Sequence, residues 1–294
     1  MRLVSTALTL ALATALPPPA PDLRPEAVAA WDQYVALTEA RIARELDDRD
    51  RFLVHERLGQ AAGDWRARAR RGEVVLRRHE TPGPDGRDVD VPDARIHHWV
   101  GVAFFPGVAL DDLLRLLQTR WTERWSPDVV EARLVWQAGN EAQTFLRLRQ
   151  RSVITVTYDT EHLVRYDRID ANHAASRSTA IRIAQIADAG TPRERALPPG
   201  QDHGFLWRLN AYWRYEVVDG GLLVELESLT LSREVPWLLV PVAEPIVRRL
   251  SRDSVVRTLT SLRDRARAIL TEEAPRVGAS ARAPRERPPS STSR

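Results

Sequence analysis

Cysteine and lysine are both absent from this chain of 294 residues. Without cysteine there can be no disulfide, zinc–thiolate site, thiol nucleophile or iron–sulfur cluster. All 43 basic residues are therefore arginines, and because 40 acidic residues nearly balance them, the formal charge is only +3. Arginine alternates with Asp and Glu, which is typical of a solvated surface, and no basic stretch is interleaved with aromatics. We therefore expect no nucleic-acid binding.

Apolar runs long enough to cross a membrane are also missing. Residues 1–16 begin with a cation and continue with an uncharged apolar stretch of about 14 residues, short of the ~20 that a spanning helix needs. Small residues and the proline-rich segment 17–21 follow, a combination typical of a secretory signal. We predict a signal peptide over residues 1–20 and export to the periplasm or beyond. An uncleaved membrane anchor is the alternative.

Helix and strand patterns follow one another along the rest of the chain. Apolar residues at spacings of three and four predict a helix from Pro25 to Leu46, and Leu110 to Leu117 give a second helix over residues 108–119. Runs rich in β-branched and aromatic residues predict single strands. These strands cover residues 73–77, 96–105, 152–169 and 175–187.

Two hairpins are predicted from their registers. Asp219-Gly220 is a favoured two-residue turn, and it places Trp213 opposite Leu226 and Arg214 opposite Glu225. In the second hairpin a three-residue loop, 138–140, keeps the apolar residues of both strands on one face. That register sets Trp136 opposite Ala142.

A long amphipathic helix closes the ordered sequence. Pro245 starts a helical piece and Ser251 restarts it as an N-cap, after which Val255, Leu259 and Leu262 form an apolar stripe. Consecutive strands, one inserted helix and this long helix predict an α+β fold: a curved antiparallel sheet gripping the C-terminal helix, with an extra N-terminal helix. We expect an N-terminal helical segment over 21–71, one domain over 72–272 and a disordered tail over 273–294.

The order of these elements resembles the START-like, or SRPBCC, superfamily of helix-grip proteins. The resemblance lies in HHWVGVAFFPGVALDDLL at 97–114, SRSTAIRI at 176–183, DHGFLWRLNAYWRYEVVDGGLLVELESLTLSREVP at 202–236, and the helix after Ser251. It implies that a hydrophobic small molecule, such as a lipid, isoprenoid or polyketide, binds between sheet and helix. Some members of the superfamily are instead cyclase- or hydrolase-like enzymes.

The sheet face that carries Trp213 supplies the candidate ligand-binding residues. Each aromatic on it could simply fill the core, but ligand cavities are mostly apolar and aromatic with a few polar groups. Arg177 shares strand parity with Ile181 and is expected to anchor an acidic head group, or else to lie at the rim. The predicted lining is Trp136, Arg177, Ile181, Trp207, Trp213, Tyr215, Leu226, Ser228 and Leu259.

Neither a cofactor, a metal site nor a catalytic residue is predicted. The adjacent His97 and His98 point to opposite faces of a strand, so they cannot easily share an ion. There is no phosphate-binding glycine loop, dinucleotide fingerprint, G-x-S-x-G or H-E-x-x-H. An enzyme on the same scaffold is the alternative function. A third possibility is an envelope interaction protein, since the arginine-bearing tail could contact an anionic membrane surface weakly.

Overall fold

The computed structural model describes residues 23–57, 64–151, 155–234 and 240–274, with side chains of the last segment from residue 251 onward. The predicted signal peptide and the predicted tail beyond residue 274 lie outside what is described. No described helix is long and apolar enough to cross a membrane.

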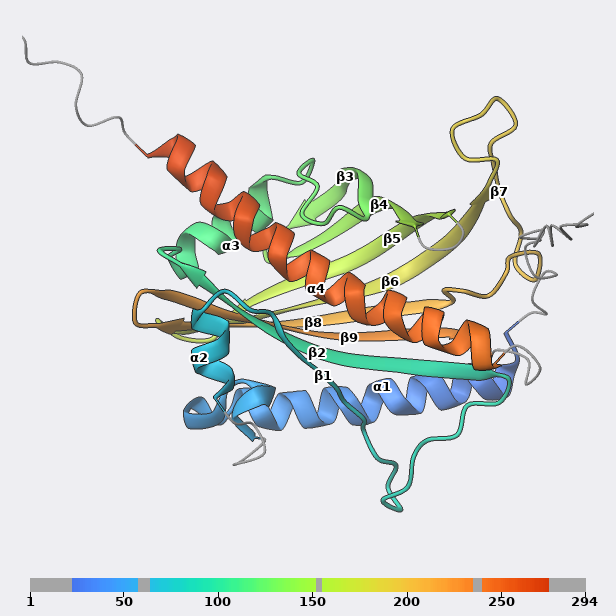
Figure 1. Cartoon of the computed structure of the whole chain (residues 1–294), viewed down its shortest axis with the longest axis horizontal. Helices are drawn as coiled ribbons and strands as arrows, with labels where there is room; N and C mark the ends of the chain where they lie inside the picture. The colour runs from blue at the N-terminus through green and yellow to red at the C-terminus, as the bar shows by residue number, and fades with distance from the viewer. Residues whose placement is uncertain (1–22, 58–63, 152–154, 235–239, 275–294) are drawn as a thin grey trace, which may run out of the picture.

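One antiparallel sheet of nine strands organises the chain, and it curves around its C-terminal helix (Figure 1). The strands run in the order β1-β2-β9-β8-β6-β5-β4-β3, with the short β7 paired to β6. Their bounds are β1 Val75–Arg78, β2 Ala94–Pro106, β3 Val129–Ala138, β4 Glu141–Arg151, β5 Thr155–Arg168, β6 His173–Ala187, β7 Arg195–Ala196, β8 Arg208–Val218 and β9 Gly221–Arg233.

Helices cover both faces of this sheet. The long helices α1 (Pro25–Leu46) and α4 (Val240–Glu273) lie on opposite faces (Figure 1). The α4 face also carries α3 (Leu110–Thr119), whereas the short α2 (Trp65–Arg70) and the 3-10 turn η1 (Arg49–Arg51) follow α1. The predicted α+β fold, with a sheet gripping a C-terminal helix and an extra N-terminal helix, is confirmed. We call the two faces of the sheet the α4 face and the α1 face.

The β8–β9 hairpin has the register expected from its turn. Trp213 pairs with Leu226 and Arg214 with Glu225, as predicted. Gly220 adopts a φ of 80°, a left-handed conformation that glycine reaches without steric cost. This hairpin lies in the middle of the sheet and sends alternate side chains to the two helical faces.

The predicted three-residue loop in the β3–β4 hairpin is wrong. Ala138 pairs with Glu141, so the turn has two residues, and Trp136 pairs with Gln143 instead of Ala142. The register then shifts between Leu134 and Trp136, which leaves Val135 without a cross-strand partner. A β-bulge of this kind inserts one residue into one strand. Because of this bulge, the turn has only two residues, while Leu134 still pairs with Thr144 as predicted farther along the hairpin.

Helix α4 is continuous from Val240 to Glu273, so the predicted start at Pro245 and the predicted restart at Ser251 are also wrong. Its stripe of Val255, Leu259 and Leu262 is buried against the sheet, as predicted. The helix comes so close to β2 that a Cβ added at Gly101 would lie 2.8 Å from Val255 Cγ1 and 3.1 Å from Leu259 Cδ1. Only a residue without a side chain fits this contact.

We predict that Gly101→Ala destabilises the protein by about 1–3 kcal/mol, because the added methyl group overpacks the contact with α4. In a Val255→Ala background the same change should cost less, since the nearest methyl is gone, with a coupling energy of about 0.5–3 kcal/mol. Urea unfolding of the four proteins measures this coupling. Strictly additive costs would contradict the packing described here.

Candidate functional site

The α4 face holds a closed apolar core where several predicted ligand-binding residues meet. Tyr215, Leu226 and Leu259 have exposed fractions of 1%, 4% and 0% and belong to one cluster. Trp213 packs against this cluster, with its ring stacked on Tyr215 at a centroid distance of 6.5 Å. Ser228 is half-buried between Trp99 and Ala211 on the same face. These residues are brought together as predicted, and among them Tyr215, Leu226 and Leu259 fill the core.

Trp136 and Trp207 do not join this group. The bulge at Val135 turns Trp136 to the other face, where its Nε1 donates to Gln143 Oε1 at 2.7 Å and 39% of the residue stays exposed. Trp207 precedes β8, so strand parity does not govern it. It packs with the cluster beneath α1, and its Nε1 donates to Asp202 Oδ1 at 3.2 Å. The predicted shared face is therefore wrong for both tryptophans.

A second bulge separates Ile181 from Arg177. Glu161 pairs with Arg182 and His162 with Ala180, so Ile181 has no cross-strand partner and is 50% exposed. The expectation that Arg177 and Ile181 share strand parity along β6 fails because of this inserted residue. Arg177 lies on the α1 face, where it pairs with Tyr212.

Arg177 lines a cleft between α1 and the sheet. The cleft has a volume of about 260 Å³ and is walled by α1 on one side and by β5, β6 and β8 on the other. Its lining residues are Glu39, Ile42, Ala43, Leu46, Arg165, Asp167, Ala175, Ser176, Arg177, Tyr212, Trp213 and Arg214. Among the described residues, Arg177 and Trp213 are the two predicted site residues in this lining, although the Trp213 ring itself packs on the α4 face.

The charged side chains of the cleft differ in whether they form hydrogen bonds or ion pairs with other described residues. Asp167 accepts a hydrogen bond from Arg165 Nε at 2.9 Å, and Glu39 accepts one from the Tyr212 hydroxyl at 3.0 Å. Arg177 is exposed, and no hydrogen bond or ion pair joins its guanidinium group to the part of the chain that the structure describes. It is therefore the cleft charge that remains available to an incoming anion.

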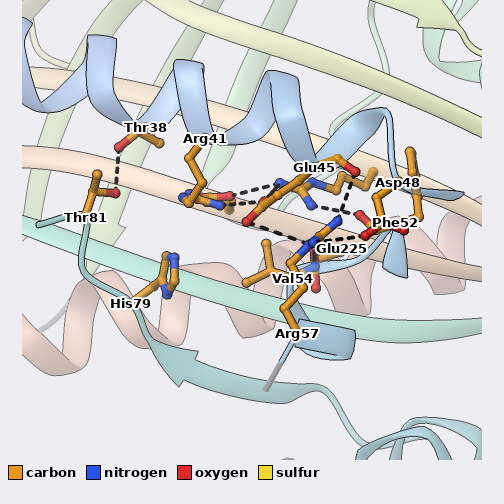
Figure 2. Close-up of polar contacts among 12 residues, drawn as sticks. Thr38, Arg41, Glu45, Asp48, Phe52, Val54, Arg57, His79, Thr81 and Glu225 are labelled. Carbon is orange, nitrogen blue, oxygen red and sulfur yellow. Dashed lines mark hydrogen bonds and ion pairs between the residues drawn. The ribbon is translucent and has the colours of Figure 1, made fainter. Parts of the chain in front are cut away.

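A buried network of charges holds α1 against the sheet next to this cleft (Figure 2). Arg214, whose side chain is 2% exposed, donates from Nη2 to Glu45 Oε2 at 2.6 Å and from Nη1 to the Phe52 carbonyl at 2.8 Å. Arg41 of α1 ion-pairs with both Glu45 and Glu227. Since an unpaired buried charge is very costly, each of these groups requires its partners.

The two glutamates of β9 are fixed from several directions. Glu225 accepts hydrogen bonds from the Val54 amide at 2.8 Å and from the His55 amide and ring. Burial alone would raise the pKa of Glu225, but the hydrogen bond from His55 and the nearby charge of Arg214 bring it below its ordinary value. His98 and Arg41 act in the same way on Glu227 and hold its pKa at about 2 despite burial. Both carboxylates are ionised.

Sequence reasoning missed this network, although a signal for it is present. The run IHHWVGVAFF in β2 is apolar at successive positions, and β9 places Leu223, Leu229 and Leu231 on the same face as its glutamates. A strand that is apolar on both faces is covered on both. The charged positions of β8 and β9 therefore belong to a covered face, whereas alternation alone suggested solvent.

His97 and His98 point to opposite faces, as predicted: His97 Nε2 contacts Ser232 Oγ at 3.0 Å, and His98 Nε2 contacts Glu227 Oε1 at 2.7 Å. His98 nevertheless has a second histidine beside it, His79, which the sequence reading did not connect with it. His79, His98 and Glu227 are the described residues whose donor atoms lie close enough together to hold a metal ion.

One histidine of the α4 face has the surroundings of a potential base. His162 Nε2 lies 2.9 Å from Thr160 Oγ1, and its Nδ1 lies 3.2 Å from Ser178 Oγ. Burial lowers the pKa of His162 to about 4, so the ring is neutral at ordinary pH. Its hydrogen bonds run to hydroxyls and none runs to a carboxylate, so the Ser–His–acid arrangement is not formed by these contacts.

Comparisons with known proteins give only distant likenesses. No family model and no curated protein matches the sequence. Similar solved structures include a STAR-related lipid transfer protein from Xanthomonas axonopodis, with 17% identity, 60% of this chain and 96% of that chain covered, and a TM-score of 0.41. Human STARD10 is 9% identical over 71% of this chain and 82% of that one, with a TM-score of 0.39.

The Zhui aromatase/cyclase from Streptomyces is 11% identical over 60% of this chain and 96% of that chain, with a TM-score of 0.38. Likenesses this distant do not identify a ligand or a reaction for this chain. The fold itself is a curved antiparallel sheet with a long C-terminal helix on one face.

We predict that Arg214→Met lowers the free energy of unfolding by about 3–5 kcal/mol, because it leaves buried carboxylates without their cation. The matched control is Arg182→Met, which removes an exposed Arg–Glu pair of the same sheet and should cost no more than about 1 kcal/mol. Urea unfolding at neutral pH compares the two variants. Equal costs would show that the network on the α1 face is not buried as described.

Proposed function

We propose that this protein binds a small apolar molecule carrying an anionic group, in the cleft between α1 and strands β5, β6 and β8. The observation that carries the proposal is the cleft itself, which has an apolar wall and, beside it, one arginine side chain without a hydrogen bond or ion pair to the described residues. Ile42, Ala43 and Leu46 offer apolar surface on α1, and Arg177 offers a planar guanidinium suited to a carboxylate. The proposal includes export, which the N-terminal sequence alone supports.

The size of the cleft limits the ligand. Pockets for drug-sized ligands span roughly 300–1,000 Å³, and this cleft, at about 260 Å³, lies just below that range. A single acyl chain or a small ring system fits, with its charged end at Arg177. A two-chain lipid would have to leave most of its surface outside. We therefore favour a single-chain amphiphile as the ligand.

A second place for an apolar ligand is the α4 face along β3 to β6. Leu134 of this face is 37% exposed, and the Tyr158 hydroxyl is buried without a hydrogen-bond partner among the described residues. A ligand bound there would contact both the apolar Leu134 side chain and the polar Tyr158 hydroxyl. The enzyme alternative belongs to the same face, where His162 is the candidate base; turnover abolished by His162→Gln with binding retained would favour it.

Isothermal titration of the full chain with decanoate, and with decanol as the uncharged match, tests the proposal. Arg177→Ala should weaken decanoate binding roughly tenfold, because a charge-assisted hydrogen bond is lost, and should leave decanol unaffected. Ala43→Trp should remove binding of both, because the indole fills the cleft.

Matched controls separate these effects from damage to the fold. Ala40→Trp places the same indole on an exposed position of α1, and Arg193→Ala removes an exposed arginine that does not line the cleft. Both should bind decanoate like the wild type. The proposal is wrong if Ala43→Trp binds normally, or if Leu134→Asp on the α4 face is the variant that loses binding.

A further inference from the structure

Three side chains able to bind a metal converge under α1, at a place separate from the cleft. They come from neighbouring strands: His79 directly after β1, His98 in β2 and Glu227 in β9. The His79 amide donates to the His98 carbonyl at 3.0 Å, which continues the β1–β2 ladder and sets the two rings side by side. Glu227 pairs with Val100, two positions from His98. Strand pairing therefore fixes all three positions.

The donor atoms are already close together. One nitrogen of each histidine and one oxygen of Glu227 lie within 4.8 Å of one another. The two rings meet edge to face, with centroids 4.9 Å apart. Helix α1 forms the roof of the site, and His79 lies on the sheet side of this helix (Figure 2). The three side chains thus lie between the sheet and α1.

Two buried atoms of these residues lack a hydrogen-bond partner. His79 Nε2 and Glu227 Oε2 make no hydrogen bond to the described residues, although Glu227 Oε2 lies 3.8 Å from Arg214 Nη2, and the Glu227 side chain is only 2% exposed. An unsatisfied buried polar group costs about 1–3 kcal/mol. A buried nitrogen and a buried carboxylate oxygen that both lack a hydrogen bond point to a third species that contacts both.

We propose that His79, His98 and Glu227 bind one divalent transition-metal ion, with zinc as the best match and water as the fourth ligand. Two imidazoles and one carboxylate are a ligand set that zinc accepts, with an open fourth position. Metal binding requires neutral imidazoles, each with one ring nitrogen free of hydrogen.

The hydrogen bonds around His98 can accommodate the ion. His98 Nδ1 now lies 2.7 Å from the Tyr34 hydroxyl, while its Nε2 lies 2.7 Å from Glu227 Oε1. When the metal takes Nε2, the ring proton moves to Nδ1 and is donated to the Tyr34 oxygen. The Tyr34 hydroxyl then donates to the Thr81 side chain, with which it already interacts. No proton is gained or lost overall.

Nearby arginines set the limits of the site. The 3.3 Å contact between Arg77 Nη2 and His79 Nδ1 must open, because Nδ1 then carries a hydrogen. Arg41 contacts Glu227 and repels a cation, but it is also paired with Glu45 at 2.7 Å. One carboxylate oxygen of Glu227 can thus stay with Arg41 while Oε2 binds the metal. Arg214 Nη2 lies 3.8 Å from Oε2 and keeps its closer partner, Glu45 Oε2, at 2.6 Å.

The test uses tag-free full-length protein stripped with a chelator and titrated with Zn²⁺ by calorimetry. We expect one ion per chain, a higher melting temperature with zinc, and visible absorption typical of tetrahedral Co²⁺ when cobalt replaces it. His79→Ala should weaken zinc binding at least about tenfold, and Glu227→Gln should do the same. His203→Ala, which alters a histidine bound to Gln185, is the control and should bind normally.

Two outcomes would overturn the proposal: no one-to-one zinc binding by the wild type, or undiminished binding by His79→Ala. Either result would mean that the three side chains do not form a metal site. His79 is partly exposed, so its alanine variant should fold, and its melting curve without metal verifies this. The decanoate titration is independent of this result, since none of the three residues lines the cleft.

Discussion

The position of α1 depends on one buried set of charges, in which Arg214 and Arg41 meet Glu45 and Glu227. Without it, the buried glutamates of the sheet would lack their cations and α1 would have no fixed position on this face. With it, α1 becomes one wall of the cleft and the roof over His79 and His98. Both proposed binding sites are consequences of this contact.

A buried ion pair contributes little net stability compared with an apolar contact of the same shape. Removing one partner is nevertheless strongly destabilising, because the other charge is then buried without a counter-charge. We interpret the network as what fixes the position of α1, while the apolar residues beside it supply the attraction. Trp31, Tyr34 and Ile42 are buried there with Leu229 and Leu231 of β9. On the same face, the apolar contacts therefore stabilise the packing of α1, and the ion pairs fix its position.

Local patterns predicted much of the fold correctly. The β8–β9 register follows from a two-residue turn and a run of matched pairs, and the buried stripe of α4 follows from its spacing. Two bulges escaped prediction, at Val135 and at Ile181. A bulge is one inserted residue, and its position depends on the pairing with the neighbouring strand, so the pattern of a single strand does not show it. It nevertheless moves every residue beyond it to the opposite face of the sheet.

The prediction of the candidate site was affected most by these changes of face. Arg177 and Trp136 were assigned by parity to the α4 face and lie on the other one, whereas Tyr215 and Leu226, in the unbulged hairpin, lie where expected. The cleft residues of α1 could not be found from strand patterns at all. They depend on how two elements far apart in sequence dock, which here is decided by paired charges.

Hydrogen exchange of the wild-type protein tests the docking of α1 most directly. Buried, packed helices open only with the global unfolding of a domain, whereas loosely attached ones exchange by local opening. Amides of residues 38–46 should exchange as slowly as those of β2 and β9, because the charge network ties them to these strands. Fast exchange of this segment, with the strands still protected, would contradict the account.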